Sequence, residues 1–351
     1  MSPTSVAGFA CVVVAAGLLA SAAARAQDAD RLYANAKDEK TLVLYGGGPA
    51  APYERMARDF ERRYPGIAVA VTGGFSNVLD RKIDEQLAAD KLDVDMAFFQ
   101  TAQDFVRWKK AGRLLAFKPD GYDKIDPRFR DEDGAFTTAS VVLLTYAYNT
   151  KLVAAADVPT SAVDFLKSQF AGKLVTAYPA DDDATLYVFD TIVKKYGWDY
   201  MTRYMAQRPS FIQGHLEVLR SVAAGANLVT FDSTSSTTGA LKESGQPIAF
   251  AFPRDDALPT FFVTAGIFRA APHPNAAKLF LDWYMAQEQQ RRLGTYSART
   301  DVEPPDGLKP LSAYKIEAGY LQFVGDEARL AELRKRFEGY AGPVVNAGGV
   351  R

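Results

Sequence analysis

Small and polar residues follow the apolar runs of this sequence, in patterns that suit the capture of a small polar molecule. The candidates are Tyr45, Gly46, Gly47, Ser76, Asn77, Gln100 and Thr101 in the first half, and Tyr178, Asp182, Asp232, Ser233, Thr234 and Ser235 in the second. Glycine lets backbone N–H groups approach a ligand because no side chain intervenes. Hydroxyl and amide groups at a helix start, together with its free N–H groups, can receive an anion. The same residue types are also ordinary helix caps, so both roles stay open for each residue.

An acidic run, Asp181-Asp182-Asp183, precedes a predicted helix. Its carboxylates could bind a cation or an amine, but acidic residues also interact favourably with the positive end of the helix dipole. We favour the second role and expect at most one of the three to contact a ligand. Arg254 could bind a carboxylate or phosphate through two parallel hydrogen bonds, or pair with the neighbouring Asp255-Asp256.

Residues typical of an enzyme active site are scarce. The chain has one cysteine, Cys11, and two histidines, His215 and His273. It has no G-x-S-x-G nucleophile motif and no G-K-[ST] phosphate-binding motif, and Gly46-Gly47-Gly48-Pro49 lacks the spacing of a dinucleotide site. Catalysis by a carboxylate pair stays open because acidic residues are abundant. We therefore predict a binding protein rather than an enzyme, with no cofactor and no bound metal.

Two stretches of alternating strands and helices position the candidate residues. The first has predicted strands over 41–45, 67–71 and 94–99, each followed by a helical pattern. The second starts with a strand at 173–177 and has another at 228–231. Short links between strand and helix favour mostly parallel sheets. In such sheets ligands bind beyond the C-terminal ends of the strands, which is where the candidate residues lie.

Two long β-prone runs, near 139–149 and 247–264, separate these stretches and are typical of crossings between two lobes. The C-terminal part is predicted to be helical, at 274–292 and at 326–339.

The N-terminus has features of an export signal. Val6–Ala24 is small and apolar and is followed by an A-x-A cleavage pattern ending at Ala26, although Met1–Ser5 carries no Lys or Arg. We expect a signal peptide over residues 1–26 and export to the periplasm. An uncleaved anchor is the alternative, but a span requires about 18 or more solidly apolar residues. Cleavage removes Cys11, so the mature chain can form no disulfide. The 41 basic and 42 acidic residues balance, which argues against a nucleic-acid partner.

The chain resembles the type II periplasmic-binding-protein superfamily, in the branch of ABC-transporter proteins that includes ferric-ion-binding proteins. The resemblance covers about residues 40–300 and rests on five segments: TLVLYGGGPAAPYERMARDFERRYPGIAV, LDVDMAFFQTAQDFVRWKKAGRLLAF, ASVVLLTYAYNTKLV, SVAAGANLVTFD and FFVTAGIFRAAPHPNAAKLFLDWYMAQEQQRRLG. It implies an α/β fold of two lobes, each a mostly parallel sheet with flanking helices, joined by two hinge crossings. We expect lobe 1 to comprise 27–144 and 254–315, lobe 2 to comprise 145–253, and 316–351 to form a C-terminal helical segment packed on the lobes.

This resemblance implies a solute-binding protein that closes about its hinge on a small ligand and delivers it to the membrane permease subunits of an ABC transporter. Iron-binding members carry an adjacent tyrosine pair after the strand that here ends at Phe231, where this chain has Asp232 and Ser233. Because tyrosinate oxygens suit ferric iron, their replacement argues against direct ferric binding. The hydroxyls, glycines and aromatic residues of the candidate loops favour a small polar organic ligand with one anionic group. We expect a monomer whose binding weakens when Ser233 and Thr234 are replaced by alanine. A ferric-ion or ferric-chelate binder, a periplasmic enzyme and a ligand sensor on this fold are the alternatives.

Overall fold

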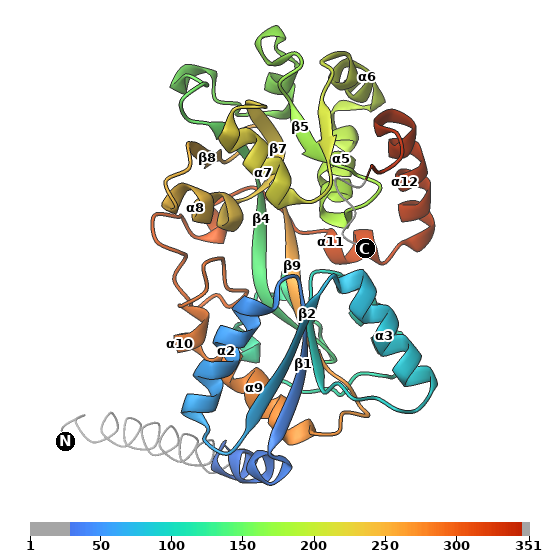
Figure 1. Cartoon of the computed structure of the whole chain (residues 1–351), viewed down its shortest axis with the longest axis vertical. Helices are drawn as coiled ribbons and strands as arrows, with labels where there is room; N and C mark the ends of the chain where they lie inside the picture. The colour runs from blue at the N-terminus through green and yellow to red at the C-terminus, as the bar shows by residue number, and fades with distance from the viewer. Residues whose placement is uncertain (1–28, 346–351) are drawn as a thin grey trace, which may run out of the picture.

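Two long strands, β4 (Thr137–Asn149) and β9 (Leu258–Ile267), run side by side between two lobes of the molecule (Figure 1). The computed structural model describes residues 29–345. The two strands are antiparallel, with Thr137 opposite Ala265 and Leu143 opposite Thr260. Twelve of the thirteen β4 residues are buried, which explains why this part of the sequence is an almost unbroken apolar run. The predicted crossing near 139–149 is therefore confirmed as a strand. Of the predicted crossing over 247–264, only the part from Leu258 belongs to the crossing strand β9, because Ile248–Ala251 forms a separate strand beside β4.

The first lobe contains a parallel three-stranded unit flanked by helices. Its strands are β1 (Thr41–Gly47), β2 (Ala68–Gly74) and β3 (Met96–Phe99), and its helices are residues 29–39, α2 (Ala50–Arg63), α3 (Ser76–Ala88), α4 (Ala102–Lys110), α9 (Pro274–Met285) and α10 (Gln287–Gln290). The sheet order is β2-β1-β3-β9-β4-β7, where β7 (Val229–Thr234) comes from the second lobe. Each strand ends where its apolar run meets glycine or a polar residue, and the next helix starts there.

The second lobe repeats the alternation with shorter strands. Its strands are β5 (Val175–Ala177), β6 (Ser210–Ile212), β7 (Val229–Thr234) and β8 (Ile248–Ala251), and its helices are α5 (Asp183–Tyr196), α6 (Trp198–Ala206), α7 (His215–Ala224) and α8 (Ser235–Glu243). β5 is parallel to β6, and Leu174 just before β5 forms a parallel bridge with Val229. The expected two-lobed α/β fold is confirmed.

The expectation of mostly parallel sheets holds for β2-β1-β3 and for β5-β6 but not for the strands at the crossing. β9 is antiparallel to both β3 and β4, and β4 is antiparallel to β7 and β8. The sheet is mixed because β4 carries the chain from the first lobe to the second and β9 carries it back in the opposite direction. The predicted helix over 274–292 is also two helices, since Ala286 has an extended ψ of 141° that ends α9.

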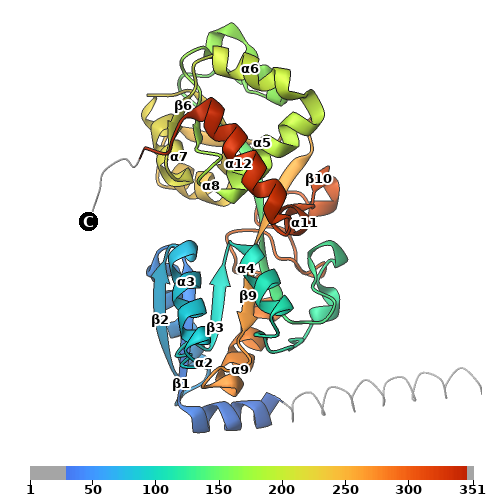
Figure 2. The ribbon, with the colours of Figure 1, turned by 90° about the vertical axis from the view of Figure 1, so that its right-hand side faces the viewer.

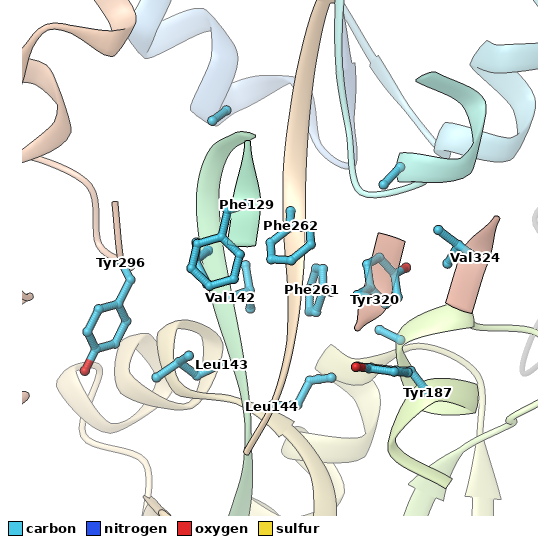
Figure 3. Close-up of a cluster of buried hydrophobic side chains, with 14 of the residues drawn as sticks. Phe129, Val142, Leu143, Leu144, Tyr187, Phe261, Phe262, Tyr296, Tyr320 and Val324 are labelled. Atoms are coloured by element: carbon cyan, nitrogen blue, oxygen red, sulfur yellow. The ribbon is translucent and has the colours of Figure 1, made fainter. Parts of the chain in front are cut away.

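A hydrophobic cluster follows the crossing strands from one lobe into the other (Figure 3). Val142, Leu143 and Leu144 of β4 lie in it with Phe261 and Phe262 of β9. The C-terminal segment adds β10 (Ile316–Glu317), which pairs with β9, and the helices α11 (Tyr320–Val324) and α12 (Glu327–Ala341). α11 contacts both α4 and α5, and α12 lies across the second lobe against α5 (Figure 2).

Short 3-10 turns complete the described chain, at Tyr122–Lys124, Pro127–Phe129, Ala155–Asp157, Ala162–Leu166, Ser168–Phe170 and Leu311–Ala313. Within residues 29–345, no helix combines the length and the apolar character needed to cross a bilayer. The predicted signal peptide, residues 1–26, lies outside the described residues.

Candidate ligand-binding site

The ends of β1 and β3 meet at a small polar group in the first lobe. The Gly47 carbonyl oxygen accepts hydrogen bonds from the Tyr53 hydroxyl at 3.1 Å and from Gln100 Nε2 at 3.2 Å. The Ser76 hydroxyl donates to Gln100 Oε1 at 3.1 Å. A Cβ atom on Gly47 would lie 2.3 Å from both Ser76 Oγ and Gln100 Oε1, so this group requires glycine here. Three predicted site residues are thus brought together.

The start of α3 exposes two apolar side chains beside this group. Phe75 is 79% exposed and Val78 is 50% exposed, and Asn77 between them is exposed as well. The N–H groups of Val78 and Leu79 already donate to the Phe75 carbonyl. The N–H groups of Ser76 and Asn77 have no acceptor within the described chain, so they remain available to a ligand.

The other predicted residues of this lobe pack rather than point outward. The Tyr45 side chain is 2% exposed, its hydroxyl donates to Asp93 Oδ1 at 3.1 Å, and Lys82 lies over its ring. Tyr45 was predicted to contact the ligand, but in the structure its side chain packs in the core. Gly46 supports the site indirectly, because a Cβ there would lie 2.4 Å from the Tyr53 ring. Thr101 is half-buried at the N-cap of α4.

A buried carboxylate organises the second lobe. Asp232 is fully buried, and its Oδ2 accepts from the Thr176 hydroxyl at 3.0 Å, the Ala177 N–H at 3.0 Å and the Thr185 hydroxyl at 2.9 Å. Its Oδ1 lies 2.9 Å from His215 Nε2. Both oxygens already have partners, so the predicted contact of Asp232 with a ligand is corrected. The carboxylate instead connects β5, α5 and α7 to β7.

His215 lies at the first position of α7 between two aspartates. Its Nδ1 lies 3.5 Å from Asp182 Oδ2, on the side opposite Asp232. Desolvation alone would lower the pKa of His215, but the charges of Asp232 and Asp182 outweigh it and raise the pKa to about 10. The imidazole is therefore a cation at neutral pH. Asp182 also caps α5, where it accepts from the Thr185 N–H at 2.9 Å.

The hydroxyl residues at the end of β7 have structural partners within the protein. Ser233 is fully buried, with its Oγ 3.0 Å from Thr145 Oγ1 of the crossing strand β4. Thr234 caps α8 by accepting from the Thr237 N–H at 3.2 Å. We therefore correct the expected contacts of Ser233 and Thr234 with a ligand to structural hydrogen bonds. Ser235 is 5% exposed at the start of α8, and Tyr178 is buried against the Phe211 ring.

One hydrogen bond joins the two sets of loops. Gln103 Nε2 of α4 donates to Asp183 Oδ2 of α5 at 2.8 Å, so the start of α4 in the first lobe meets the start of α5 in the second. We call the following the interlobe residues: Gly47, Phe75, Ser76, Asn77 and Gln100 of the first lobe, and Asp182, His215 and Leu216 of the second.

The residues that sequence reasoning missed lie around α7. Leu216 is 41% exposed beside His215. Both follow β6, a strand of three residues that no apolar run reveals, so nothing in the sequence placed them at a strand end. Gly214 before α7 has a φ of 83° and was the one local signal of a sharp turn into this helix. Within residues 29–345 no group of three acidic, histidine or cysteine side chains could hold a metal ion.

Sequence comparisons with known proteins find bacterial solute-binding proteins. The profile of the family described as bacterial extracellular solute-binding protein matches residues 55–310. A probable ABC transporter periplasmic-binding protein of Sinorhizobium fredii, y4fP, is 22% identical over 251 residues, which are 68% of this chain and 67% of that protein.

Solved structures of similar shape bind different molecules. Iron-bound HitA of Pseudomonas aeruginosa has a TM-score of 0.71 at 19% identity, covering 85% of this chain and 99% of HitA. AfuA of Actinobacillus pleuropneumoniae, with bound fructose-6-phosphate, has a TM-score of 0.70 at 19% identity, covering 87% and 100%. An ABC-transporter substrate-binding protein of Agrobacterium tumefaciens has a TM-score of 0.75 at 15% identity, covering 86% and 94%. These likenesses confirm the predicted fold.

Proposed function

This chain belongs to the family of bacterial extracellular solute-binding proteins, and from that premise we propose that it holds a small polar organic ligand, bearing an anionic group, between its two lobes. Proteins of this family are the solute-binding components of ABC transporters rather than a class of enzymes. We propose further that the chain is exported to the periplasm by its N-terminal segment, acts there as a monomer, and delivers its ligand to membrane permease subunits.

The observation that carries this proposal is the exposed apolar surface on the interlobe residues. Phe75 is 79% exposed at the start of α3 in one lobe, and Leu216 is 41% exposed at the start of α7 in the other. Exposed large apolar side chains at facing helix starts gain stability when a ligand covers them or when the lobes approach. Movement of the lobes about β4 and β9 would accomplish both, and a ligand that contacts both lobes would favour the closed arrangement.

The polar groups at these helix starts support an anionic ligand. The N–H groups of Ser76 and Asn77 lack acceptors within the described chain, as do those of His215 and Leu216, because Val218 is the first residue of α7 whose N–H bonds back, to Gly214. Two helix starts with free N–H groups favour negative charge on the ligand.

The arrangement supports an organic ligand over bare ferric iron. Iron needs several hard anionic ligands, and the carboxylate near the end of β7, Asp232, already has four partners. Since HitA and AfuA share this fold but hold iron and a sugar phosphate, similarity of shape does not decide the ligand.

We propose the same division of the chain as the sequence predicted. Lobe 1 comprises 27–144 and 254–315, lobe 2 comprises 145–253, and 316–351 is the C-terminal segment.

A thermal-shift screen tests the proposal. Protein purified after expression of the full chain is screened against organic acids, amino acids, phosphonates, sugar phosphates, polyamines and ferric salts. A ligand that binds only the native state stabilises it by about 2.7 kcal/mol at a concentration of 100 times its Kd, which raises the melting temperature clearly. A shift with an anionic organic class supports the proposal. A shift confined to ferric salts or polyamines overturns the ligand class. If no class gives a shift, mass spectrometry of the denatured protein decides whether it was purified already loaded.

A further inference from the structure

A cavity of about 330 Å³ lies in the second lobe, on the opposite half of α5 from the interlobe residues. The interlobe residue Asp182 caps the start of α5, whereas the cavity is lined by the later part of that helix, from Val188 to Tyr196. The remaining walls come from the crossing strands β4 and β9, from Phe231 of β7 and from β10 with the residue before it. The volume is at the lower end of the range of small-molecule sites, about 300–1,000 Å³.

We propose that this cavity is a second binding site, and that it takes a small apolar acid: an aliphatic or aromatic body with one carboxylate or similar anionic group. This site is distinct from the one between the lobes and does not depend on the function proposed above.

The walls of the cavity explain the apolar body. Leu144 of β4, Val188 and Ile192 of α5, and Phe231 of β7 line it, and Pro259 of β9 completes the apolar surface. None of these side chains offers a hydrogen bond, so an apolar group gains by leaving water here, by about 25 cal/mol for each Å² covered.

The charged groups around the cavity explain the single anionic group. Asp256 already accepts from the Tyr146 hydroxyl at 2.7 Å, the Ala162 N–H at 2.6 Å and Lys195 Nζ at 2.6 Å. Lys194 pairs with Asp190 at 2.7 Å. Each of these charges therefore has its opposite charge within the protein.

The two charged residues on the β10 side of the cavity, Glu317 and Lys315, differ in their hydrogen-bond partners. Glu317 Oε1 accepts from the Tyr187 hydroxyl and from the Gly319 N–H, both at 3.2 Å. Lys315 is exposed, and its ammonium group has no partner among residues 29–345. Among residues 29–345, Lys315 is thus the one charged residue of the cavity wall with neither an ion-pair partner nor a hydrogen-bond partner, and an anion on the ligand supplies both. A cation would meet only Glu317, which already accepts two hydrogen bonds.

Binding of a matched set of probes tests this site. The probes are octanoate, octylamine and octanol, which share an apolar chain and differ in the charge of the head group, and isothermal titration calorimetry measures their binding to protein purified from the full chain. We expect octanoate to bind at one site, octanol to bind more weakly and octylamine not to bind. Lys315→Ala should weaken octanoate binding by about threefold, as for an exposed ion pair, and Lys315→Glu by more.

Two blocking variants locate the site. Ala257→Phe and Thr191→Phe each add a ring to a half-buried residue of the cavity wall, and circular dichroism verifies that each variant is folded. Either variant should abolish octanoate binding, whereas Phe75→Ala, at the interlobe residues, should leave it unchanged. The proposal is overturned if octanoate fails to bind, if its binding survives both blocking variants, or if Phe75→Ala removes it. Octylamine binding as tightly as octanoate would overturn the assignment to an acid.

Discussion

Gln103 in α4 of the first lobe donates a hydrogen bond of 2.8 Å to Asp183 at the start of α5 in the second lobe. The other oxygen of Asp183 pairs with Arg334 of α12. A single carboxylate thus connects both lobes and the C-terminal helix, at the level of the proposed ligand site. The relative orientation of the lobes depends on this contact as well as on the crossing strands.

Replacing Gln103 with alanine should loosen that orientation. A hydrogen bond of this kind contributes about 1 kcal/mol, so its loss should let the ligand-free lobes sample a wider range of separations. Double electron–electron resonance measures this between nitroxides on cysteines introduced at Arg58 of α2 and Asp199 of α6, both exposed. Gln207→Ala is the matched control, because Gln207 Nε2 donates to the Leu166 carbonyl within the second lobe at 2.9 Å. Identical distance distributions for the two variants would contradict the prediction.

His215→Gln should destabilise the protein most at acidic to neutral pH. The folded protein raises the pKa of His215 from 6.5 to about 10, so the protonated imidazole stabilises the fold fully below pH 6.5, and this contribution is lost as the pH rises toward 10. Glutamine keeps a donor toward Asp232 but lacks the charge. We expect a loss of about 2 kcal/mol in the free energy of unfolding near pH 6, shrinking as the solution becomes alkaline. Urea denaturation across this range checks the trend, and a loss that grows with pH would refute it.

Phe75→Ala should weaken ligand binding without weakening the fold. The side chain is 79% exposed, so its removal costs the folded protein little. If a ligand or the opposite lobe covers the ring on closure, the loss of apolar contact should reduce affinity roughly tenfold. Calorimetry with the ligand identified by the thermal-shift screen measures the effect. Val163→Ala is the control, since Val163 is 42% exposed but lies in the 3-10 turn Ala162–Leu166. Equal affinity of the Phe75 variant and the native protein would remove Phe75 from the site.

Alanine at Gly46 and at Gly47 should have different consequences. At Gly46 the new Cβ would lie 2.4 Å from the Tyr53 ring, and overpacking of this kind costs about 1–3 kcal/mol of stability. At Gly47 it would meet only the ends of the Ser76 and Gln100 side chains, which can rotate away. Gly47→Ala should therefore disturb the polar group and weaken binding with little loss of stability. Thermal unfolding and ligand titration of both variants distinguish these effects, and equal loss of stability in the two would count against the argument.

The sequence was a reliable guide to the elements whose apolar pattern is long. The β4 run over 139–149 predicted a crossing strand because both of its faces are buried, and the structure places the strand at Thr137–Asn149. β6 was missed because Ser210-Phe211-Ile212 is too short to show a pattern. One helix was predicted over 274–292, whereas the structure has two helices that are separated at Ala286. The extended backbone of Ala286 leaves no signal in the pattern of side chains.

The candidate site was harder to predict because polar residues after a strand can face either way. Ser76 and Gln100 lie at a strand end and meet there, as the topology of parallel strands requires. Asp232 and Ser233 lie near the end of β7, but Thr176, Thr185 and Thr145 hold them in the interior. Their partners come from strands and helices far away in the sequence, and only the three-dimensional structure shows that these hydrogen bonds are already made.

The continuity of β4 has a consequence for how this protein folds. The first part of this strand pairs with β9 and its last residues pair with β7 and β8, so one uninterrupted segment belongs to the hydrogen-bonded ladders of both lobes. Neither half of the molecule can complete its sheet until residues more than a hundred positions apart in the chain have come together. Such non-local pairing slows folding and makes it cooperative, because melting one half removes an edge from the other. We therefore expect the two lobes to form and unfold as one unit.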